Sequence, residues 1–282
     1  MATAQAHAKL NLSLHLTGKR ADGYHLLESL VVFTELADVL SAEKADALSL
    51  AVTGEFAGGL EGGDNLVLRA ARLLQQHTGY AGGAALRLEK NIPIGGGLGG
   101  GSADAAAALR LLNDLWQLGL GETDLLALAP QLGADVAACV LSGPAIIRGV
   151  GETVSPLVQP MPAFTAVLAH PRVPLLTAQV YAMVEEIRPG QPPMQEPADD
   201  WLAAVRAMRN DLQRPAIAAT PIVAEMLLAM ETAAPKPELV RMTGSGACCF
   251  ALFTDADRAA AYADSIRRQY PGWWVRLSAL RG

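Results

Sequence analysis

Cysteine is scarce in this sequence, and its positions give no sign of a disulfide framework or a zinc site. The three cysteines are Cys139, Cys248 and Cys249, so the count is odd and two of them are adjacent. Such a set does not close into regular disulfides, and no Cys-x-x-Cys or Cys/His spacing typical of zinc ligands is present. We therefore expect three small, buried thiols in a protein of a reducing compartment.

An excess of basic charge is also lacking. Lys and Arg together number 22 against 28 Asp and Glu, which gives a formal net charge of −6 with neutral histidines. Nonspecific nucleic-acid binding depends on clustered basic side chains, so we expect no nucleic-acid partner. A phosphate-bearing small molecule stays compatible with this charge, because backbone N–H groups and a single lysine are enough to bind phosphate.

Long apolar runs are absent as well. No stretch of about 20 apolar residues is present, so we expect no membrane span. The opening MATAQAHAKLNLSLHL has neither a basic n-region nor a long apolar h-region, so it does not read as a signal peptide, and we expect a cytoplasmic protein. The 282 residues are 51% hydrophobic, which suffices for a substantial core and for two domains of ordinary size.

Glycine, by contrast, is concentrated in one place. The stretch PIGGGLGGGSAD at residues 93–104 holds six glycines in seven positions, although glycine in a regular element costs about 0.5–1 kcal/mol relative to alanine. A helix is predicted to follow at once over Ser102–Leu118, with the Ser102 hydroxyl as its N-cap and Gly119 closing it. Bare N–H groups that lead into a helix N-terminus form a site for an anion.

Three other interpretations of this loop fit less well. Gly95-x-Gly97-x-x-Gly100 matches the dinucleotide fingerprint formally, but NIPI separates the strand from the loop, and no acidic strand end follows about 20 residues on. The P-loop requires Lys before its Ser, where this chain has Gly101. A flexible linker would not run straight into a long helix. Anion binding is the interpretation that remains.

The rest of the chain alternates between strand and helix patterns. Residues 8–17 alternate with period two, so we expect a half-buried strand with Lys9 and Asn11 on its polar face. Further helices are predicted over 64–76 with Asp64 as N-cap, over 123–129, 134–141, 201–213, 221–233 and 255–269. Further strands are predicted over 48–52, 84–89, 145–149, 165–169, 238–246, 247–253 and 273–280, and residues 26–44 are predicted to be a strand followed by a connection.

Prolines mark two further segments. They cluster near residues 156–162, where the pattern changes, so we predict domains of residues 1–155 and 156–282. A second stretch, RPGQPPMQEPADD at residues 188–200, is predicted to be a mobile surface loop.

Four ordered motifs together carry a resemblance to a known superfamily. PIGGGLGGGSADAAAAL looks like the central phosphate loop of the GHMP kinases, and MTGSGACCFALF resembles their C-terminal glycine motif. The opening AKLNLSLHLTGKRADGYHLLESL, together with LGADV, is similar to one branch, the 4-diphosphocytidyl-2-C-methyl-D-erythritol kinases of the nonmevalonate isoprenoid pathway. The resemblance implies an α+β, two-domain fold. Its N-terminal ATP-binding and catalytic domain would resemble domain 2 of ribosomal protein S5, and its substrate-side C-terminal domain would be ferredoxin-like, with the active site in the cleft between them.

The resemblance also implies a reaction and its catalytic residues. The γ-phosphoryl group of ATP would move to the 2-hydroxyl of the methylerythritol unit, with Asp135 as general base and Lys9 as its cationic partner. Each residue has an ordinary explanation too, because Lys9 could lie on a solvated strand face and Asp135 could cap a short helix.

Further roles follow from the same resemblance. Tyr24 is expected to stack on the cytosine and His25 to bind its edge. The expected ATP-binding residues are Pro93, Ile94, Gly95, Gly96, Gly97, Leu98, Gly99, Gly100, Gly101, Ser102 and Ala103, and the expected substrate-binding residues are Asn11, Tyr24, His25, Thr177, Tyr181, Gly244, Ser245 and Gly246. Mg²⁺ is expected as cofactor, and a monomer or weak homodimer as assembly. No metal ligand is assigned, because Asp104 at the helix start could equally complement the helix dipole.

The chain departs from the family pattern at two positions, and three rival functions stay open. Ala137 stands where the family usually has Pro, and Arg172 where it usually has Gly. The rivals are a kinase of homoserine or mevalonate, a nucleotide-binding regulatory protein without catalysis, and an NAD-dependent oxidoreductase. The ADGYH segment argues against the first, because those substrates carry no base to stack. Lys9 with Asp135 argues against the second, and the loop context against the third.

Overall fold

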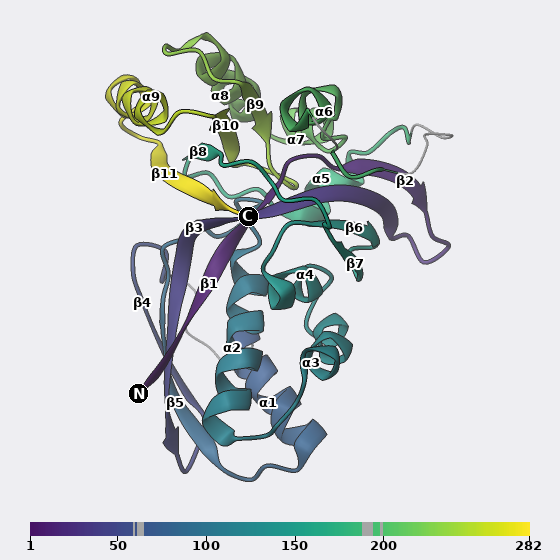
Figure 1. The fold of residues 1–282 in the computed structure, drawn as a ribbon, viewed down its shortest axis with the longest axis vertical. Coiled ribbons are helices and arrows are strands. Elements are labelled where there is room, and N and C mark those ends of the chain that lie inside the picture. Colours follow the sequence, from purple (N-terminus) through teal and green to yellow (C-terminus); the bar gives the residue numbers. More distant parts are fainter. Residues whose placement is uncertain (59, 61–64, 188–193, 198–199) are drawn as a thin grey trace. The chain divides into compact units, whose positions relative to one another are not determined.

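Two sets of interleaved segments make up the fold in the computed structural model, which describes residues 1–58, 60, 65–187, 194–197 and 200–282 (Figure 1). The first unit comprises residues 1–9, 36–94 and 99–142, and the second comprises residues 10–35, 95–98 and 143–282. The long strand β3 (His25–Ala45) and the glycine loop therefore each contribute residues to both units. The expected α+β class is confirmed, whereas the predicted boundary at residues 155/156 stays a prediction.

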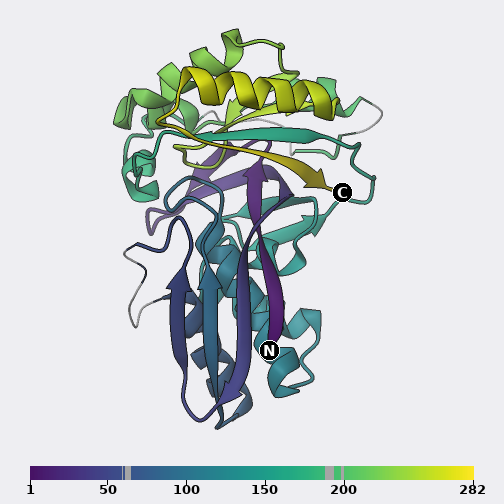
Figure 2. The same cartoon turned by 90° about the vertical axis from the view of Figure 1, so that its left-hand side faces the viewer.

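The first unit is a sheet covered by helices on one face. Strand β5 (Gly83–Glu89) pairs antiparallel with the second half of β3 and parallel with β4 (Ser49–Thr53), and β1 (Ala2–Asn11) also pairs with β3. Alternate residues of β5, among them Leu86 and Leu88, are buried beneath the helices. The helices are α1 (Leu66–Thr78), α2 (Gly100–Trp116), α3 (Glu122–Leu128), a 3₁₀ turn (Ala129–Gln131) and α4 (Val136–Leu141), and Figure 2 shows α1 and α2 behind the strands.

The second unit contains a longer run of antiparallel strands. Its order is β9 (Leu239–Met242), β10 (Cys249–Phe253), β8 (Thr165–His170), β11 (Trp274–Arg281) and then the first half of β3, which also pairs with β2 (His15–Lys19) and β6 (Ala145–Gly149). Strand β7 (Thr153–Pro156) extends β6. The helices are α5 (Thr177–Ala182), α6 (Trp201–Ala207), α7 (Gln213–Ala219), α8 (Ile222–Thr232) and α9 (Ala256–Gln269). Helices α8 and α9 pack on strands β8–β11, over a core that includes Tyr262 and Trp274 (Figure 1).

The structure corrects several sequence predictions. The strand expected over residues 8–17 is two strands, and Lys9, Asn11 and Ser13 of its expected polar face are buried. The helix expected over 201–213 ends at Ala207, and α7, which begins at Gln213, was not predicted. Between the two helices the Asn210 amide donates to the Met242 and Gly244 carbonyls at 2.8 Å each. Strand β7 and helix α5 were not predicted. The N-cap of α1 is Asn65, whose side-chain oxygen accepts the Val67 N–H at 2.9 Å, so the prediction of Asp64 as N-cap is wrong. Asp64 itself and most of the proline-rich segment 188–200 lie outside the described residues.

The helix after the glycine loop also differs at both ends. It begins at Gly100, with Gly99 as N-cap, so the prediction of Ser102 as N-cap is wrong. It ends at Trp116, and Gln117 rather than Gly119 closes it in the left-handed conformation, with φ 58°. The three cysteines are buried free thiols, as expected. No helix in the described segments combines the length and the apolar character that crossing a membrane requires.

Candidate functional site

The first feature of the site is an ion pair between β1 and the start of α4. The Lys9 ammonium donates to the Asp135 carboxylate at 2.8 Å, and the two side chains are 4% and 36% exposed, respectively. A buried ammonium is costly unless a carboxylate neutralises it, so Lys9 depends on this partner. The solvated strand face proposed as the ordinary explanation of Lys9 is therefore excluded, and the half-open carboxylate remains accessible to a ligand.

Asp135 occupies the N-cap position of α4 but does not cap it with its side chain. Its backbone has φ −81° and ψ −9°, and the carboxylate makes no capping hydrogen bond. The Asp135 carboxylate contacts Lys9 instead, so helix capping does not explain the residue. Ala137, where the family usually has Pro, is buried in the first turn of α4, and the helix begins without a proline.

The C-terminal part of the glycine loop brings α2 up to the Lys9 side chain. Gly99 has φ +66°, and a Cβ atom there would lie 3.3 Å from both Cβ and Cε of Lys9. This position favours glycine for two reasons, the left-handed backbone and the close approach to Lys9. The backbone N–H groups of the first turn of α2 are therefore presented near a buried ammonium.

The N-terminal part of the loop packs against the turn that follows β9. Gly97 has φ +74°, and a Cβ there would lie 2.4 Å from the Thr243 carbonyl oxygen. The Cys248 N–H donates to the Gly96 carbonyl at 3.1 Å, and a Cβ on Gly244 would lie 2.8 Å from the Gly97 carbonyl oxygen. The two glycine motifs found in the sequence are thus in direct backbone contact.

Asn11 carries an acceptor without a hydrogen-bond partner beside this turn. Its backbone N–H donates to the Thr243 hydroxyl at 2.9 Å, and its side-chain NH₂ donates to the Ser29 hydroxyl at 2.7 Å. Its Oδ1 is buried with no hydrogen-bond partner in the part of the chain that the structure describes, close to Gly244. A buried acceptor of this kind is suited to a ligand hydroxyl or amine.

Two further pairs bring predicted substrate residues together. The Thr177 and Ser245 hydroxyls are 2.9 Å apart, and the His25 and Tyr181 rings have centroids 5.2 Å apart with a tilt of 34°. Partial burial, and then the charge of Lys19, lower the pKa of His25, so its ring is neutral near pH 7 and can both donate and accept. Tyr24 is 65% exposed, which leaves its ring accessible to a ligand.

The second departure from the family pattern, at Arg172, is accommodated by the backbone. Arg172 adopts the left-handed conformation with φ +59°, in which glycine is least strained, and its N–H donates to Nδ1 of His170 at 3.1 Å. Burial first, and then the charge of Arg172, lower the pKa of His170 to about 4. His170 is therefore neutral at physiological pH and accepts this hydrogen bond.

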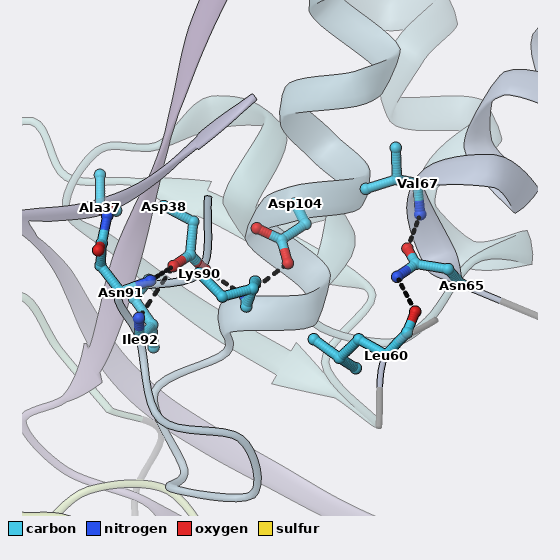
Figure 3. A network of polar contacts seen from close by, with 9 residues as sticks. All are labelled: Ala37, Asp38, Leu60, Asn65, Val67, Lys90, Asn91, Ile92 and Asp104. Carbon is cyan, nitrogen blue, oxygen red and sulfur yellow. Dashed lines mark hydrogen bonds and ion pairs between the residues drawn. The ribbon is translucent and has the colours of Figure 1, made fainter. Parts of the chain in front are cut away.

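A buried charge cluster beside the glycine loop was not predicted from the sequence. Lys90 contacts both Asp38 and Asp104, the latter at 2.6 Å, and Figure 3 shows the two carboxylates converging on the ammonium. Asp104 therefore neither caps α2 nor lies exposed to complement its dipole. Neither Lys90 nor Asp38 belongs to a sequence motif that indicates a charge cluster. Thr243, which accepts the Asn11 N–H, was not predicted either, although it lies in the glycine motif MTGSG next to Gly244.

Comparison with known proteins gives the family of this chain. The GHMP kinases N terminal domain matches residues 65–143, and the GHMP kinases C terminal domain matches residues 197–272. The chain is 47% identical over 289 residues to 4-diphosphocytidyl-2-C-methyl-D-erythritol kinase of Cereibacter sphaeroides, with 100% of each chain covered. It is 46% identical to the protein of the same name from Parvibaculum lavamentivorans, with 99% of this chain and 98% of that one covered.

Solved structures agree with this relationship. A crystal structure of 4-(cytidine 5'-diphospho)-2C-methyl-D-erythritol kinase superposes with a TM-score of 0.80 at 35% identity, covering 100% of both chains. Homoserine kinase from Cytophaga hutchinsonii superposes with a TM-score of 0.72 at 18% identity, covering 98% of this chain and 93% of that one. At that identity the second likeness concerns the fold alone.

The contact between the two glycine motifs gives a first prediction. Gly97→Ala should lower the free energy of unfolding by about 1–3 kcal/mol more than Gly23→Ala, because overpacking adds to the backbone strain. Gly23 is the matched control, since it has φ +91° but a Cβ atom there would meet no described atom within 4 Å. Chemical denaturation of both variants measures the difference. Equal losses would show that the close approach at Gly97 carries no cost.

Proposed function

The chain belongs to the 4-diphosphocytidyl-2-C-methyl-D-erythritol kinase family of the GHMP kinases, and on that basis we propose its substrate and mechanism. We propose that it transfers the γ-phosphoryl group of ATP to the 2-hydroxyl of 4-diphosphocytidyl-2-C-methyl-D-erythritol, a step of the nonmevalonate pathway to isoprenoid precursors. The observation that carries this proposal is the Lys9–Asp135 pair, which joins a half-open carboxylate to a buried ammonium.

The pair suits general-base catalysis. In the proposed step, Asp135 takes the proton of the substrate hydroxyl as that oxygen forms a bond to the γ-phosphorus of ATP. The bond from the γ-phosphorus to the bridging oxygen of ADP breaks, and ADP leaves with that electron pair. Lys9 binds the Asp135 carboxylate and fixes its position, and the positive charge of Lys9 offsets the negative charge that develops on the reacting oxygens.

The glycine loop is proposed to receive the triphosphate. Residues 94–102 offer backbone N–H groups, and the 17-residue helix α2 directs its positive dipole end to the same place. We expect Mg²⁺ to accompany ATP, because this ion is commonly held by substrate phosphates and water together with only one or two carboxylates. No group of three His, Cys, Asp or Glu residues surrounds a metal position in the described segments, which fits an ion held mainly by the nucleotide. No protein ligand is assigned to it.

The remaining predicted residues are proposed to bind the cytidine diphosphate alcohol. Tyr24 and Tyr181 are proposed to stack on the cytosine. Neutral His25, whose ring centroid lies 5.2 Å from that of Tyr181, suits the donor and acceptor groups at the cytosine edge. Asn11, Thr177 and the turn Gly244–Gly246 offer polar groups for the sugar and phosphates. The domain roles of residues 1–155 and 156–282, a cytoplasmic location, and a monomer or weak homodimer complete the proposal.

A panel of acceptors tests the proposed substrate. Purified protein should release ADP from ATP rapidly with 4-diphosphocytidyl-2-C-methyl-D-erythritol, and at background rates with homoserine or mevalonate. A coupled ADP assay measures all three under the same conditions. Preferential turnover of mevalonate or homoserine would replace the proposed substrate, and turnover of none of them would favour a nucleotide-binding protein without this activity.

Loss of the proposed base should slow the chemical step. We expect Asp135→Asn to lower kcat by at least about 100-fold, the low end for removal of a general base, while the KM values change little. Asp257→Asn, an exposed position in the first turn of α9, is the matched control and should keep the wild-type kcat. Near-normal turnover by a folded Asp135→Asn protein would remove Asp135 from this role.

The aromatic residues should discriminate between the two substrates. Base stacking contributes roughly 1–3 kcal/mol, so Tyr24→Ala should raise KM for the cytidine substrate about 5- to 150-fold, with KM for ATP unchanged. His25→Ala should also raise KM for the cytidine substrate alone, because it removes the hydrogen bonds to the cytosine edge. His77→Ala, an exposed histidine on α1, serves as control. Initial rates with each substrate varied in turn make the measurement, and equal changes in both KM values would argue against stacking on cytosine.

A further inference from the structure

Both ends of the glycine loop are attached to one buried ammonium. Before the loop, Lys90 contacts Asp38, whose other carboxylate oxygen accepts the N–H groups of Asn91 and of Ile92, the latter at 2.9 Å. After the loop, Lys90 donates to Asp104 in the second turn of α2 at 2.6 Å. The intervening residues 93–103 are those proposed to bind the triphosphate, so this cluster forms the base of that loop (Figure 3).

The two ends of the glycine loop also pack closely against each other around Lys90. A Cβ on Gly100 would lie 3.0 Å from Cγ2 of Ile92 and 3.4 Å from the Lys90 ammonium, so the first residue of α2 rests on the segment before the loop. The backbone of Lys90 is fixed as well, because its N–H donates to the Thr53 carbonyl at 2.7 Å and its carbonyl accepts from Phe56 at 3.2 Å. The ammonium is therefore held in place from the sheet side.

The charges of the cluster do not balance if every group is ionised. The three side chains are at most 5% exposed, and they would carry two negative charges against one positive charge. Oδ1 of Asp104 is buried and has no hydrogen-bond partner in the described part of the chain. Burial and the neighbouring Asp38 carboxylate outweigh the attraction of Lys90 and raise the pKa of Asp104 to about 7. A further titratable group near Asp104, Cys139 on α4, is neutral because burial raises its pKa to about 12.

We propose that Asp38, Lys90 and Asp104 are positioning residues for ATP, which hold the two ends of the nucleotide loop together and keep its backbone donors preorganised. The inference rests on the proposed function, since ATP is the ligand of that loop. The cluster is neutral when Asp104 carries a proton. Loss of this proton leaves a net negative charge beneath the helix end that receives the triphosphate, so the cluster opposes ATP binding at higher pH.

Two variants of Asp104 separate the attachment from the charge. Asp104→Ala removes an acceptor of Lys90 while leaving a neutral Lys90–Asp38 pair, and it should raise KM for ATP at least about tenfold through a less ordered loop. Asp104→Asn keeps a side-chain oxygen for Lys90 without a charge, so KM for ATP should stay within about threefold of wild type at pH 6.5. KM for the alcohol substrate should change little in either variant.

The pH dependence provides a readout that general loss of packing would not produce. Asp114→Asn, at an exposed position on the same helix, is the control. The protonation of ATP itself changes with pH in the same way for both variants, so it does not contribute to the difference between them. Between pH 6 and pH 9, KM for ATP should rise more in the control than in Asp104→Asn. Parallel profiles, an unchanged KM for ATP in Asp104→Ala, or equal increases in both KM values would overturn the inference.

A nucleotide-free measurement distinguishes this inference from the proposed function. Because the pKa of Asp104 is raised in the folded protein, its contribution to stability is lost as pH rises from about 4 to about 7. The Tm of the Asp114→Asn control should therefore fall more than that of Asp104→Asn over this range. If wild-type protein fails to phosphorylate the alcohol, the proposed substrate fails, while these Tm values and ATP affinities from calorimetry still decide the role of the cluster.

Discussion

The site depends on the burial of the Lys9 ammonium against a single carboxylate. An ammonium that is almost fully removed from water persists only where an opposite charge lies within contact distance, and removing one partner of such a pair typically costs about 3–5 kcal/mol. Lys9 therefore fixes Asp135 at the start of α4, and Asp135 in turn is kept from capping that helix. Gly99 belongs to the same constraint, because any side chain there would meet the Lys9 stem.

The first unit contains a second buried lysine, Lys90, and the surroundings of Lys9 and Lys90 suit different roles. Among the described residues Lys9 has one carboxylate partner, Asp135, which is one-third exposed, and in our account this carboxylate accepts the proton of the substrate. Lys90 has two partners that are both enclosed, so its cluster is suited to holding the chain rather than to chemistry. The missing lysine of a P-loop is thus not replaced within the glycine loop. Its charge is supplied in our account by Lys9, from the first strand of the chain.

The sequence predicted the positions of helices, strands and motifs better than the burial and the long-range partners of individual side chains. Periodicity and the glycine motifs located α2, β6, α8 and α9 to within two or three residues, because local pattern and turn chemistry determine such elements. The sequence could not predict that Lys9, Asn11 and Ser13 are buried, since their hydrogen-bond partners lie 17 to more than 200 residues away along the chain. The Asp38–Lys90–Asp104 cluster was missed for the same reason, because each of its members comes from a different segment of the chain.

The proposed roles of Lys9 and Asp135 make a direct geometric claim about the reacting hydroxyl. A crystal structure with a non-hydrolysable ATP analogue and 4-diphosphocytidyl-2-C-methyl-D-erythritol tests it most directly. We expect the 2-hydroxyl to lie within hydrogen-bond distance of the Asp135 carboxylate, with the γ-phosphate at the N-terminus of α2. An alcohol substrate bound with this hydroxyl away from Asp135, or a triphosphate bound away from the glycine loop, would contradict the account.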